Sequence, residues 1–436
     1  MADKLFGTDG VRGVAGEFLT AGLALALGRA ATRRTGAERP QVLVIRDTRE
    51  SGEMLQAALA AGVSSAGGDA LLGGVLPTPA APLLIRRYGF DLAAVLSASH
   101  NPYQDNGIKF FAGDGYKLSD ETELAIEREL ERTDHPPIGR VRTLRGAAED
   151  YLRELHTRFD ELDLSALNVL LDCANGATHH VAPEIFRRLG ANVTVTGAKP
   201  DGRNINAGCG STHVGTLAEA VVAGSHALGF AFDGDGDRVL AVDRRGEVVD
   251  GDELLALSAL HLRDRGLLDG NGVVVTVMTN YGFHAAMERE GVSVASTSVG
   301  DRYVLEELRA RGWMLGGEQS GHIIEMGFNR TGDGIASALL TLEALAGRDL
   351  CERDAMQKLP QRLVNVPVRD REALGRAQGL ADAVRSAALQ LAGRGRVLVR
   401  PSGTEPLVRV MVEAPSEQEA ADVCDRLAGL VRRELG

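Results

Sequence analysis

The sequence predicts an α/β protein with three mixed α/β segments of related topology, followed by a smaller α+β segment. Over residues 1–360, short aliphatic runs alternate with helical patterns, which is typical of parallel strands joined by crossover helices. Three of these runs, at residues 41–45, 168–172 and 272–278, each lead into a polar turn and then a helix. Beyond residue 360 the pattern changes to strands that flank a helix, and a long helix ends the chain.

Each element follows from hydrophobic periodicity, because apolar residues at helical spacing predict helices and short aliphatic runs bounded by turn residues predict strands. Helices are predicted at 21–34, 51–66, 119–133, 148–162 and 416–434, with one more between the strands at 362–368 and 396–400. Further strands are predicted at 69–75, 92–96, 108–111, 230–232 and 408–413. His135-Pro136-Pro137-Ile138-Gly139 indicates a break between the first two segments.

Composition narrows the possible function classes. The chain has 436 residues, of which 44% are hydrophobic and 25% charged, and its formal net charge is -12, as in globular proteins of several domains. No long Lys or Arg run occurs, so nucleic acid is disfavoured as the main partner, whereas a local basic pocket for a small anion is compatible with the sequence. The four cysteines are far apart, so neither a zinc site nor a disulfide framework is predicted. Because there is no signal-peptide core and no apolar stretch of membrane-spanning length, we expect a cytoplasmic protein with no membrane partner.

The first candidate site is the polar stretch that begins with Ser97 and Ser99 directly after a short buried strand. Asn101-Pro102 predicts a turn there, and Asn106-Gly107 predicts a second turn, after which a strand returns carrying Lys109 close to the two hydroxyls. A Ser-His hydrolase is disfavoured, because adjacent side chains of an extended chain face opposite sides and no Gly-x-Ser-x-Gly surrounds either serine. Plain loop closure is the alternative for each dipeptide taken alone.

A second candidate site is the acidic loop Asp233-Gly234-Asp235-Gly236-Asp237-Arg238, which follows a short strand. Three carboxylates separated by glycines can wrap around one hard divalent cation, which relieves their mutual repulsion. An EF-hand is disfavoured, since Arg238 and Arg244 stand where that pattern needs glycine and glutamate. A solvated surface loop is the alternative, and we predict that Asp233, Asp235 and Asp237 bind a magnesium or calcium ion.

Two further loops offer groups for a polar, anionic ligand. The stretch Gly316–His322 supplies a carboxylate, an amide, a hydroxyl and an imidazole, from Glu318, Gln319, Ser320 and His322. These groups are suited to bind the hydroxyl or amine groups of a sugar. The alternative is a polar loop in which the serine only caps a helix.

The second of these loops, Arg400–Pro406, follows a strand. The Arg400 guanidinium, the hydroxyls of Ser402 and Thr404 and the N–H of Gly403 can surround a phosphate, and Arg409 on the next strand adds charge. An ordinary turn is the alternative, but two arginines favour anion binding.

Taken together, these loops resemble the four signature loops of the α-D-phosphohexomutase superfamily, in the same order along the chain. The matching segments are Ser97–Pro102, Asp233–Arg238, Gly317–His322 and Arg400–Thr404. Within the superfamily, the glycine-rich segment Gly7–Gly13 and the residue Gln319 of the sugar loop are similar to those of the bacterial phosphoglucosamine mutases. Relatives that act on mannose and glucose phosphates more usually have methionine at the position of Gln319.

The resemblance implies four domains around a central cleft, each with one loop. They are residues 1–147 with the phosphoserine loop, 148–251 with the metal loop, 252–360 with the sugar loop and 361–436 with the phosphate loop. It also implies interconversion of glucosamine 6-phosphate and glucosamine 1-phosphate, on the route to UDP-N-acetylglucosamine and the cell wall. The partner would be an aminosugar phosphate, and the oligomeric state, a dimer included, is left open.

The implied mechanism is a phosphoryl exchange at Ser99, in which one Mg²⁺ held by Ser99, Asp233, Asp235 and Asp237 neutralises charge. A bisphosphorylated sugar would be the intermediate or activator and would turn around within the site. Lys109 is expected to handle protons near the reacting oxygen, and Arg12 and Arg238 to stabilise the phosphoserine. Glu318, Ser320 and His322 are expected to bind the sugar. The phosphate is expected to be bound by Arg400, Ser402, Gly403, Thr404 and Arg409. Asp301 stands where some relatives have histidine.

Two alternatives stay open from the sequence. One is a phosphomannomutase or phosphoglucomutase of broader specificity, and the other is a sugar-phosphate-binding protein without catalysis. The presence of nucleophile, carboxylates and anion loop together favours an enzyme.

Overall fold

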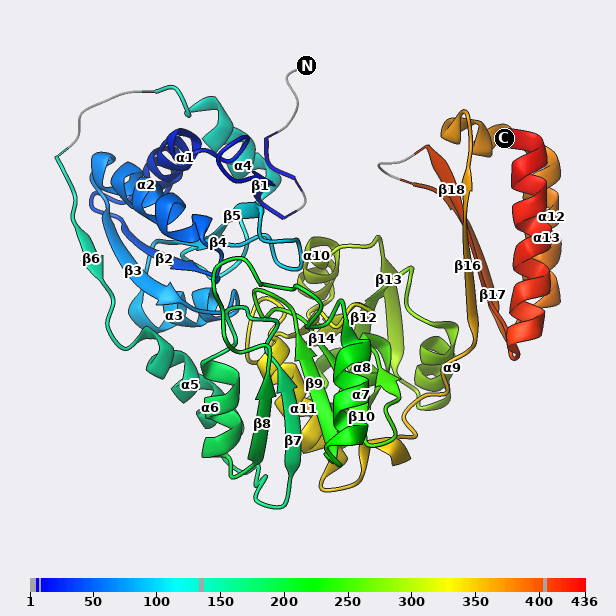
Figure 1. The fold of residues 1–436 in the computed structure, drawn as a ribbon. Coiled ribbons are helices and arrows are strands. Elements are labelled where there is room, and N and C mark those ends of the chain that lie inside the picture. The colour runs from blue at the N-terminus through cyan, green and yellow to red at the C-terminus, as the bar shows by residue number, and fades with distance from the viewer. Residues whose placement is uncertain (1–4, 8, 133–136, 403–405) are drawn as a thin grey trace. The chain divides into compact units, whose positions relative to one another are not determined.

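The computed structural model describes residues 5–7, 9–132, 137–402 and 406–436, which fold into two compact units (Figure 1). The first unit comprises Met1–Val277 and Ala295–Arg353, and the second comprises Met278–Val294 and Asp354–Gly436.

The first sheet has the strand order β1-β5-β4-β2-β3-β6. Its strands are β1 (Val11–Val14), β2 (Gln41–Arg46), β3 (Asp69–Val75), β4 (Leu92–Leu96), β5 (Asp105–Ala112) and β6 (Val141–Thr143). The accompanying helices are α1 (Ala21–Arg34), α2 (Ser51–Ser65), α3 (Ala80–Tyr88), α4 (Asp120–Arg128) and α5 (Ala147–Arg158). Strand β2 runs parallel to β3 and β4, whereas β5 runs antiparallel to both β4 and β1. Aliphatic side chains of α1, α2 and the sheet form one buried core, as parallel winding requires.

The predicted turn at Asn106-Gly107 is wrong, because both residues lie inside β5, where they pair with Gly13 and Arg12 of β1. A Cβ on Gly107 would lie 2.3 Å from the carbonyl oxygen of Ser97. The glycine therefore allows a close backbone approach within the sheet and does not reverse the chain. The predicted helix 119–133 is also shorter than expected and ends at Arg128.

The second sheet has the order β11-β10-β9-β7-β8. Its strands are β7 (Asn168–Asp172), β8 (Asn192–Thr196), β9 (Leu228–Phe232), β10 (Val239–Asp243) and β11 (Val248–Val249), and the following helices are α6 (Val181–Arg188), α7 (Val214–Ala223) and α8 (Gly251–Asp264). Helix α8 begins with a capping box, in which Asp250 accepts hydrogen bonds from the first-turn N–H groups and Glu253 accepts one from the N–H of Asp250.

The third sheet has the order β13-β12-β14-β15. Its strands are β12 (Gly272–Thr276), β13 (Ser293–Thr297), β14 (Leu315–Gly317) and β15 (Ile323–Glu325), with α9 (Tyr281–Arg289), α10 (Asp301–Arg311), α11 (Gly334–Leu345) and the 3₁₀ turns η1 (Asp269–Asn271) and η2 (Leu350–Glu352). The strands predicted to open the three α/β segments, β2, β7 and β12, each lead into a helix, namely α2, α6 and α9.

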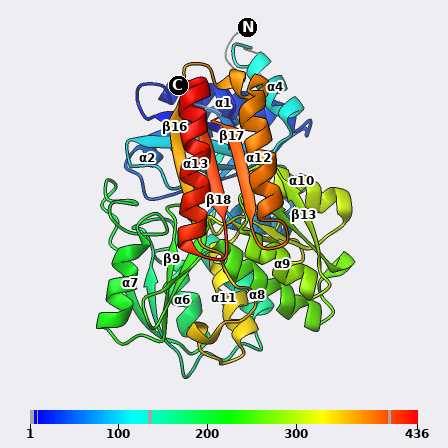
Figure 2. The same ribbon diagram turned by 90° about the vertical axis from the view of Figure 1, so that its right-hand side faces the viewer.

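The remaining sheet, in the second unit, is antiparallel with the order β16-β18-β17. It contains β16 (Gln361–Pro367), β17 (Arg396–Pro401) and β18 (Leu407–Glu413), with η3 (Arg371–Arg376), α12 (Gln378–Gln390) and α13 (Glu417–Leu435). Figure 2 shows α12 and α13 side by side along one face of this sheet, over a shared apolar core. The predicted fold class, three α/β segments and a smaller α+β segment, is confirmed.

All four predicted loops lie between two antiparallel neighbours: β4 and β5, β9 and β10, β14 and β15, and β17 and β18. Among the described residues, no helix is apolar over a length that would cross a bilayer, and the four cysteines are free thiols.

Candidate active site

Ser99 lies at the end of β4, where the chain turns toward β5. Its side chain is buried and its Oγ lies 2.5 Å from Oδ2 of Asp233. The residue has a φ of 51°, a left-handed conformation that non-glycine residues rarely adopt and that concentrates at functional sites. Its N–H donates to Oγ of Ser97 at 2.9 Å. The serine predicted as nucleophile and the first predicted metal ligand are therefore in direct contact.

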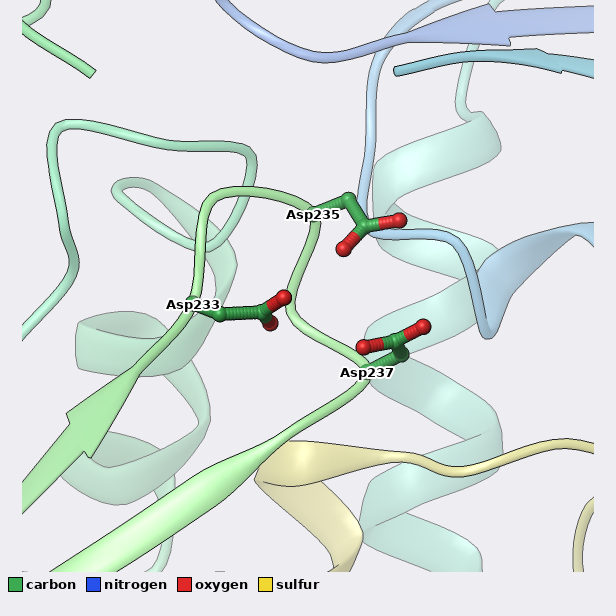
Figure 3. Close-up of side chains that lie close together, drawn as sticks. All are labelled: Asp233, Asp235 and Asp237. Carbon is green, nitrogen blue, oxygen red and sulfur yellow. The ribbon is translucent and has the colours of Figure 1, made fainter. Parts of the chain in front are cut away.

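The acidic loop connects β9 to β10, and Figure 3 shows that its three carboxylates turn toward one another. Asp233, Asp235 and Asp237 are all buried, and one carboxylate oxygen of each lies within 4.8 Å of the others. Thr78 donates to Oδ2 of Asp235 at 2.6 Å and Lys109 donates to the same oxygen at 2.8 Å. The loop is thus fixed to the first sheet as well as to its own.

The charges of this loop fit a divalent cation. Burial, together with the negative charges of Asp237 and Asp235, holds the pKa of Asp233 well above its usual range. Oδ1 of Asp235 and Oδ1 of Asp237 are buried and accept no hydrogen bond from any residue that the structure describes. Repelling carboxylates with unused buried oxygens are what a hard cation such as Mg²⁺ stabilises. A metal could bind here, with Ser99 next to it.

Lys109 lies on β5 and is buried between carboxylates. Its Nζ is 2.8 Å from Asp235, 2.9 Å from Asp9 and 3.9 Å from Asp237. Burial alone would lower the pKa of Lys109, but the charges of Asp235 and Asp9 outweigh it and raise the pKa. An amine held in this way stays protonated and balances the charge of the carboxylates.

The two predicted arginines lie near the serine. Arg12 pairs with Asp9, and the N–H of Arg238 donates to Oδ1 of Asp233 at 3.2 Å. Burial lowers the pKa of His100, and the positive charges of Arg238 and Arg12 lower it further. Both arginines therefore act electrostatically on the residue that directly follows Ser99.

The predicted sugar loop connects β14 to β15. Glu318 is mostly buried and accepts a hydrogen bond from the N–H of Gly300 at 2.9 Å, whereas Ser320 is exposed. A Cβ on Gly321, whose φ is +89°, would lie 2.0 Å from the carbonyl oxygen of Val239, so glycine there lets the loop pack on the strand that leaves the acidic loop.

His322 points toward the metal loop. Its Nε2 is 3.8 Å from Asp237 and 3.7 Å from Asp301. Gln319 donates to Oδ2 of Asp250, the N-cap of α8, at 3.2 Å. The sugar loop thus places one imidazole close to the acidic loop and is hydrogen-bonded to the start of α8 through one amide.

The predicted phosphate loop lies in the second unit. Arg400 of β17 and Arg409 of β18 face each other in register. Burial lowers the pKa of Arg400, and the like charge of Arg409 lowers it further. The buried Ser402 donates its N–H to the carbonyl oxygen of Leu407 at 2.9 Å. Two facing guanidinium groups favour an anion. Gly403 and Thr404 lie outside the described residues.

Sequence reasoning missed part of the charge network. Asp9 bridges Lys109 and Lys117, and Lys117 also pairs with Asp301. The attraction of Lys109 and Lys117 outweighs burial and holds the pKa of Asp9 well below its usual range. The signal was present, since Asp9 and Arg12 belong to the same glycine-rich segment. What the sequence did not reveal is that this segment pairs with β5.

The chain matches four family models along its length, all described as phosphoglucomutase/phosphomannomutase domains. The alpha/beta/alpha domains I, II and III match residues 3–136, 149–246 and 250–363, and the C-terminal domain matches residues 363–430. The phosphoglucosamine mutase of Moorella thermoacetica is 51% identical to this chain, over 99% of both sequences. The chain belongs to the phosphoglucosamine mutase family. Members of this family are enzymes, intramolecular phosphotransferases of the isomerase class, so the alternative of a binding protein without catalysis is set aside.

Solved structures show how widely the fold of this family is shared. A phosphoglucomutase/phosphomannomutase family protein of Burkholderia thailandensis has a TM-score of 0.83 at 24% identity and covers 99% of this chain and 98% of its own. The N-acetylphosphoglucosamine mutase of Aspergillus fumigatus, solved with GlcNAc-6P and magnesium, has a TM-score of 0.69 at 19% identity and covers 98% and 95%. At these identities the likeness establishes the fold.

Proposed function

We propose that the protein interconverts glucosamine 6-phosphate and glucosamine 1-phosphate through a phosphorylated Ser99 and a bisphosphorylated sugar, and that it supplies the synthesis of UDP-N-acetylglucosamine in the cytoplasm. The observation that carries the proposal is the contact between Ser99 and Asp233 inside a cluster of three buried carboxylates. The full-length similarity to a phosphoglucosamine mutase supports the choice of substrate.

The reaction would consist of two phosphoryl transfers. In the first, a hydroxyl oxygen of the sugar monophosphate bonds to the phosphorus and loses its proton, while the bond between Ser99 Oγ and phosphorus breaks and Oγ takes a proton. In the second, after the sugar bisphosphate has turned around, Ser99 Oγ loses its proton and bonds to the older phosphate, and the sugar oxygen left behind takes a proton. Ser99 therefore carries one phosphate before the first transfer and one after the second.

Asp233, Asp235 and Asp237, with an oxygen on Ser99, would hold one Mg²⁺, which when bound neutralises charge on the phosphoryl group in transit. The N-acetylphosphoglucosamine mutase structure that contains magnesium supports this choice of ion. Arg12 and Arg238 would then stabilise the remaining negative charge of the phosphoserine.

The substrate's resident phosphate would be bound by Arg400, Ser402 and Arg409, with Gly403 and Thr404 completing the loop as proposed from the sequence. The facing pair of arginines supports this assignment. The same site would bind the newly attached phosphate after the turn, because both phosphates present similar oxygens to a guanidinium.

Glu318 and Ser320 would hold hydroxyl or amine groups of the sugar in both orientations. His322 lies close to Asp237, and we place it at the junction of the sugar and the metal loop. Lys109 would balance the negative charge of Asp9 and Asp235 and would handle protons near the reacting oxygen, as proposed from the sequence. We retain the four-domain division proposed from the sequence, at 147/148, 251/252 and 360/361, in which each domain contributes one loop.

The test is a comparison of kcat/KM for glucosamine 6-phosphate, glucose 6-phosphate and mannose 6-phosphate with the purified enzyme and Mg²⁺. The proposal predicts a clear preference for the aminosugar phosphate. A preference for either neutral sugar phosphate would instead assign the protein the broader phosphoglucomutase or phosphomannomutase activity.

A further inference from the structure

Arg49, which the proposed mechanism does not use, is fully buried directly under the Ser99 loop. It forms an ion pair with Asp47 at 2.8 Å. Its other four N–H groups donate to backbone carbonyl oxygens, those of Ser99, Asn101 and Pro102 in the loop and that of Asp105 at the start of β5. A guanidinium has five N–H donors in a fixed plane, and all five are used here.

A second donor reaches the same loop from the second α/β segment. Nδ2 of Asn206 donates to the carbonyl oxygen of Ser99 at 2.9 Å and to that of Asn101 at 3.1 Å. Nη2 of Arg49 lies at the same 2.9 Å from the Ser99 carbonyl oxygen. A Cβ on Gly234 would lie 2.5 Å from that oxygen, so the acidic loop also packs against it.

These contacts bear on the conformation of Ser99. A left-handed φ is unfavourable for a non-glycine residue and persists only where its surroundings determine it. Turning the peptide plane after Ser99 would break both hydrogen bonds to its carbonyl oxygen and move its side chain. Oγ of Ser99 is 2.5 Å from Asp233, so a small rotation would displace it from the acidic loop.

We propose that Arg49 and Asn206 are positioning residues, which bind the Ser99 carbonyl oxygen together and thereby hold Ser99 in its left-handed conformation with Oγ facing the acidic loop. This inference rests on the proposed function, in which Oγ carries the phosphoryl group. Neither residue touches the reacting atoms, and both act through the backbone of Ser99.

The sharpest test is Asn206→Asp, which keeps size and shape but replaces the donating amide by an acceptor facing two carbonyl oxygens. Asn206→Gly is the second variant, because it removes the amide and tolerates the backbone φ of 59° at this position. The matched control is Asn204→Asp in the same loop, since the Asn204 amide also donates to a backbone carbonyl, that of Lys199 at 2.9 Å, away from Ser99.

The measurement is a single turnover at 25 °C, in which enzyme carrying labelled phosphate on Ser99 transfers it to excess glucosamine 6-phosphate. Intact mass gives the phosphate content, and steady-state assays give kcat and KM. We expect both Asn206 variants to transfer phosphate about 100-fold more slowly, the loss typical of a displacement of about 1 Å. We expect KM within twofold of the wild type, and an unchanged Asn204→Asp.

Arg49→Lys adds an independent measurement, because it keeps the charge beside Asp47 but cannot donate to four carbonyl groups at once. Transfer should slow in this variant too. Wild-type transfer rates in Asn206→Asp and Asn206→Gly would overturn the inference. If the melting temperature of these variants fell while transfer stayed unchanged, the role of Asn206 would be purely structural, and the inference would likewise be overturned. A wild-type enzyme that is not phosphorylated on Ser99 or does not react with glucosamine 6-phosphate would instead refute the proposed function.

Discussion

Replacing Lys109 by methionine should destabilise the protein strongly. The side chain is 2% exposed and its Nζ lies within 3 Å of Asp235 and of Asp9. Methionine fills a similar volume but leaves Asp235 without its cation and removes one of the cations that pair with Asp9. Breaking a buried ion pair by removing one partner costs about 3–5 kcal/mol, so we expect Lys109→Met to lower the free energy of unfolding of the first unit by about that amount.

The assay is urea unfolding followed by the fluorescence of Trp313, the chain's single tryptophan, which lies in the first unit. With a slope of about 3 kcal/mol per M, the midpoint should fall by roughly 1–2 M. The control is Arg39→Met, which removes a half-exposed arginine that pairs with Asp69 and should cost less than about 1 kcal/mol.

The loss of stability in Lys109→Met should depend on pH and on Mg²⁺ in a defined way. Because the carboxylates raise the pKa of Lys109, the stability that the ion pair contributes is fully present below the ordinary lysine pKa and lost only as the pH rises beyond it. The difference between wild type and variant should therefore be flat from about pH 6 to about pH 9. Mg²⁺ should stabilise the variant more than the wild type, since one cation that competes for Asp235 is gone. An unchanged midpoint with unchanged Mg²⁺ dependence would refute the assigned role of Lys109.

Three further predictions concern other parts of the molecule. Ser99→Ala should carry no phosphate by intact mass and lose turnover, and undiminished activity would exclude the phosphoenzyme. Arg400→Ala should raise KM and the inhibition constant of inorganic phosphate roughly ten- to hundredfold, because a charge-assisted hydrogen bond contributes about 1.5–3 kcal/mol. If both constants stayed unchanged, the phosphate would bind elsewhere. Burial raises the pKa of Asp333 to about 6, so between pH 4 and pH 6 the folded state binds a proton that the unfolded state releases. The free energy of unfolding of the wild type, relative to that of Asp333→Asn, should therefore rise by up to about 3 kcal/mol as the pH falls from 7 to 4. Parallel pH profiles of the two proteins in thermal unfolding would contradict this last prediction.

Local chemistry was enough to predict the fold class and most strands and helices. Helix α1 and strand β3 have the bounds that periodicity predicted. The acidic loop was also predictable, because three carboxylates at alternate positions of one short loop must lie close together. These features depend on residues that are near neighbours in sequence.

What could not be predicted depends on contacts between distant segments. Gly107 looks like a turn residue, and only the close approach to Ser97 explains its place inside β5. The sequence predicts proton handling for Lys109, but it does not show that Asp9 and Asp235 both pair with this lysine. Arg49 was merely a polar residue after a strand, since the four carbonyl groups that it binds belong to a segment about fifty residues later.

The most direct test of the central claim follows the phosphate itself. Enzyme labelled with radioactive phosphate on Ser99 is mixed with unlabelled glucosamine 6-phosphate, and protein, sugar bisphosphate and sugar monophosphates are separated over time. The account predicts that the label leaves Ser99, appears first in the bisphosphate and then in glucosamine 1-phosphate. Formation of glucosamine 1-phosphate while the label stays on Ser99 would contradict it.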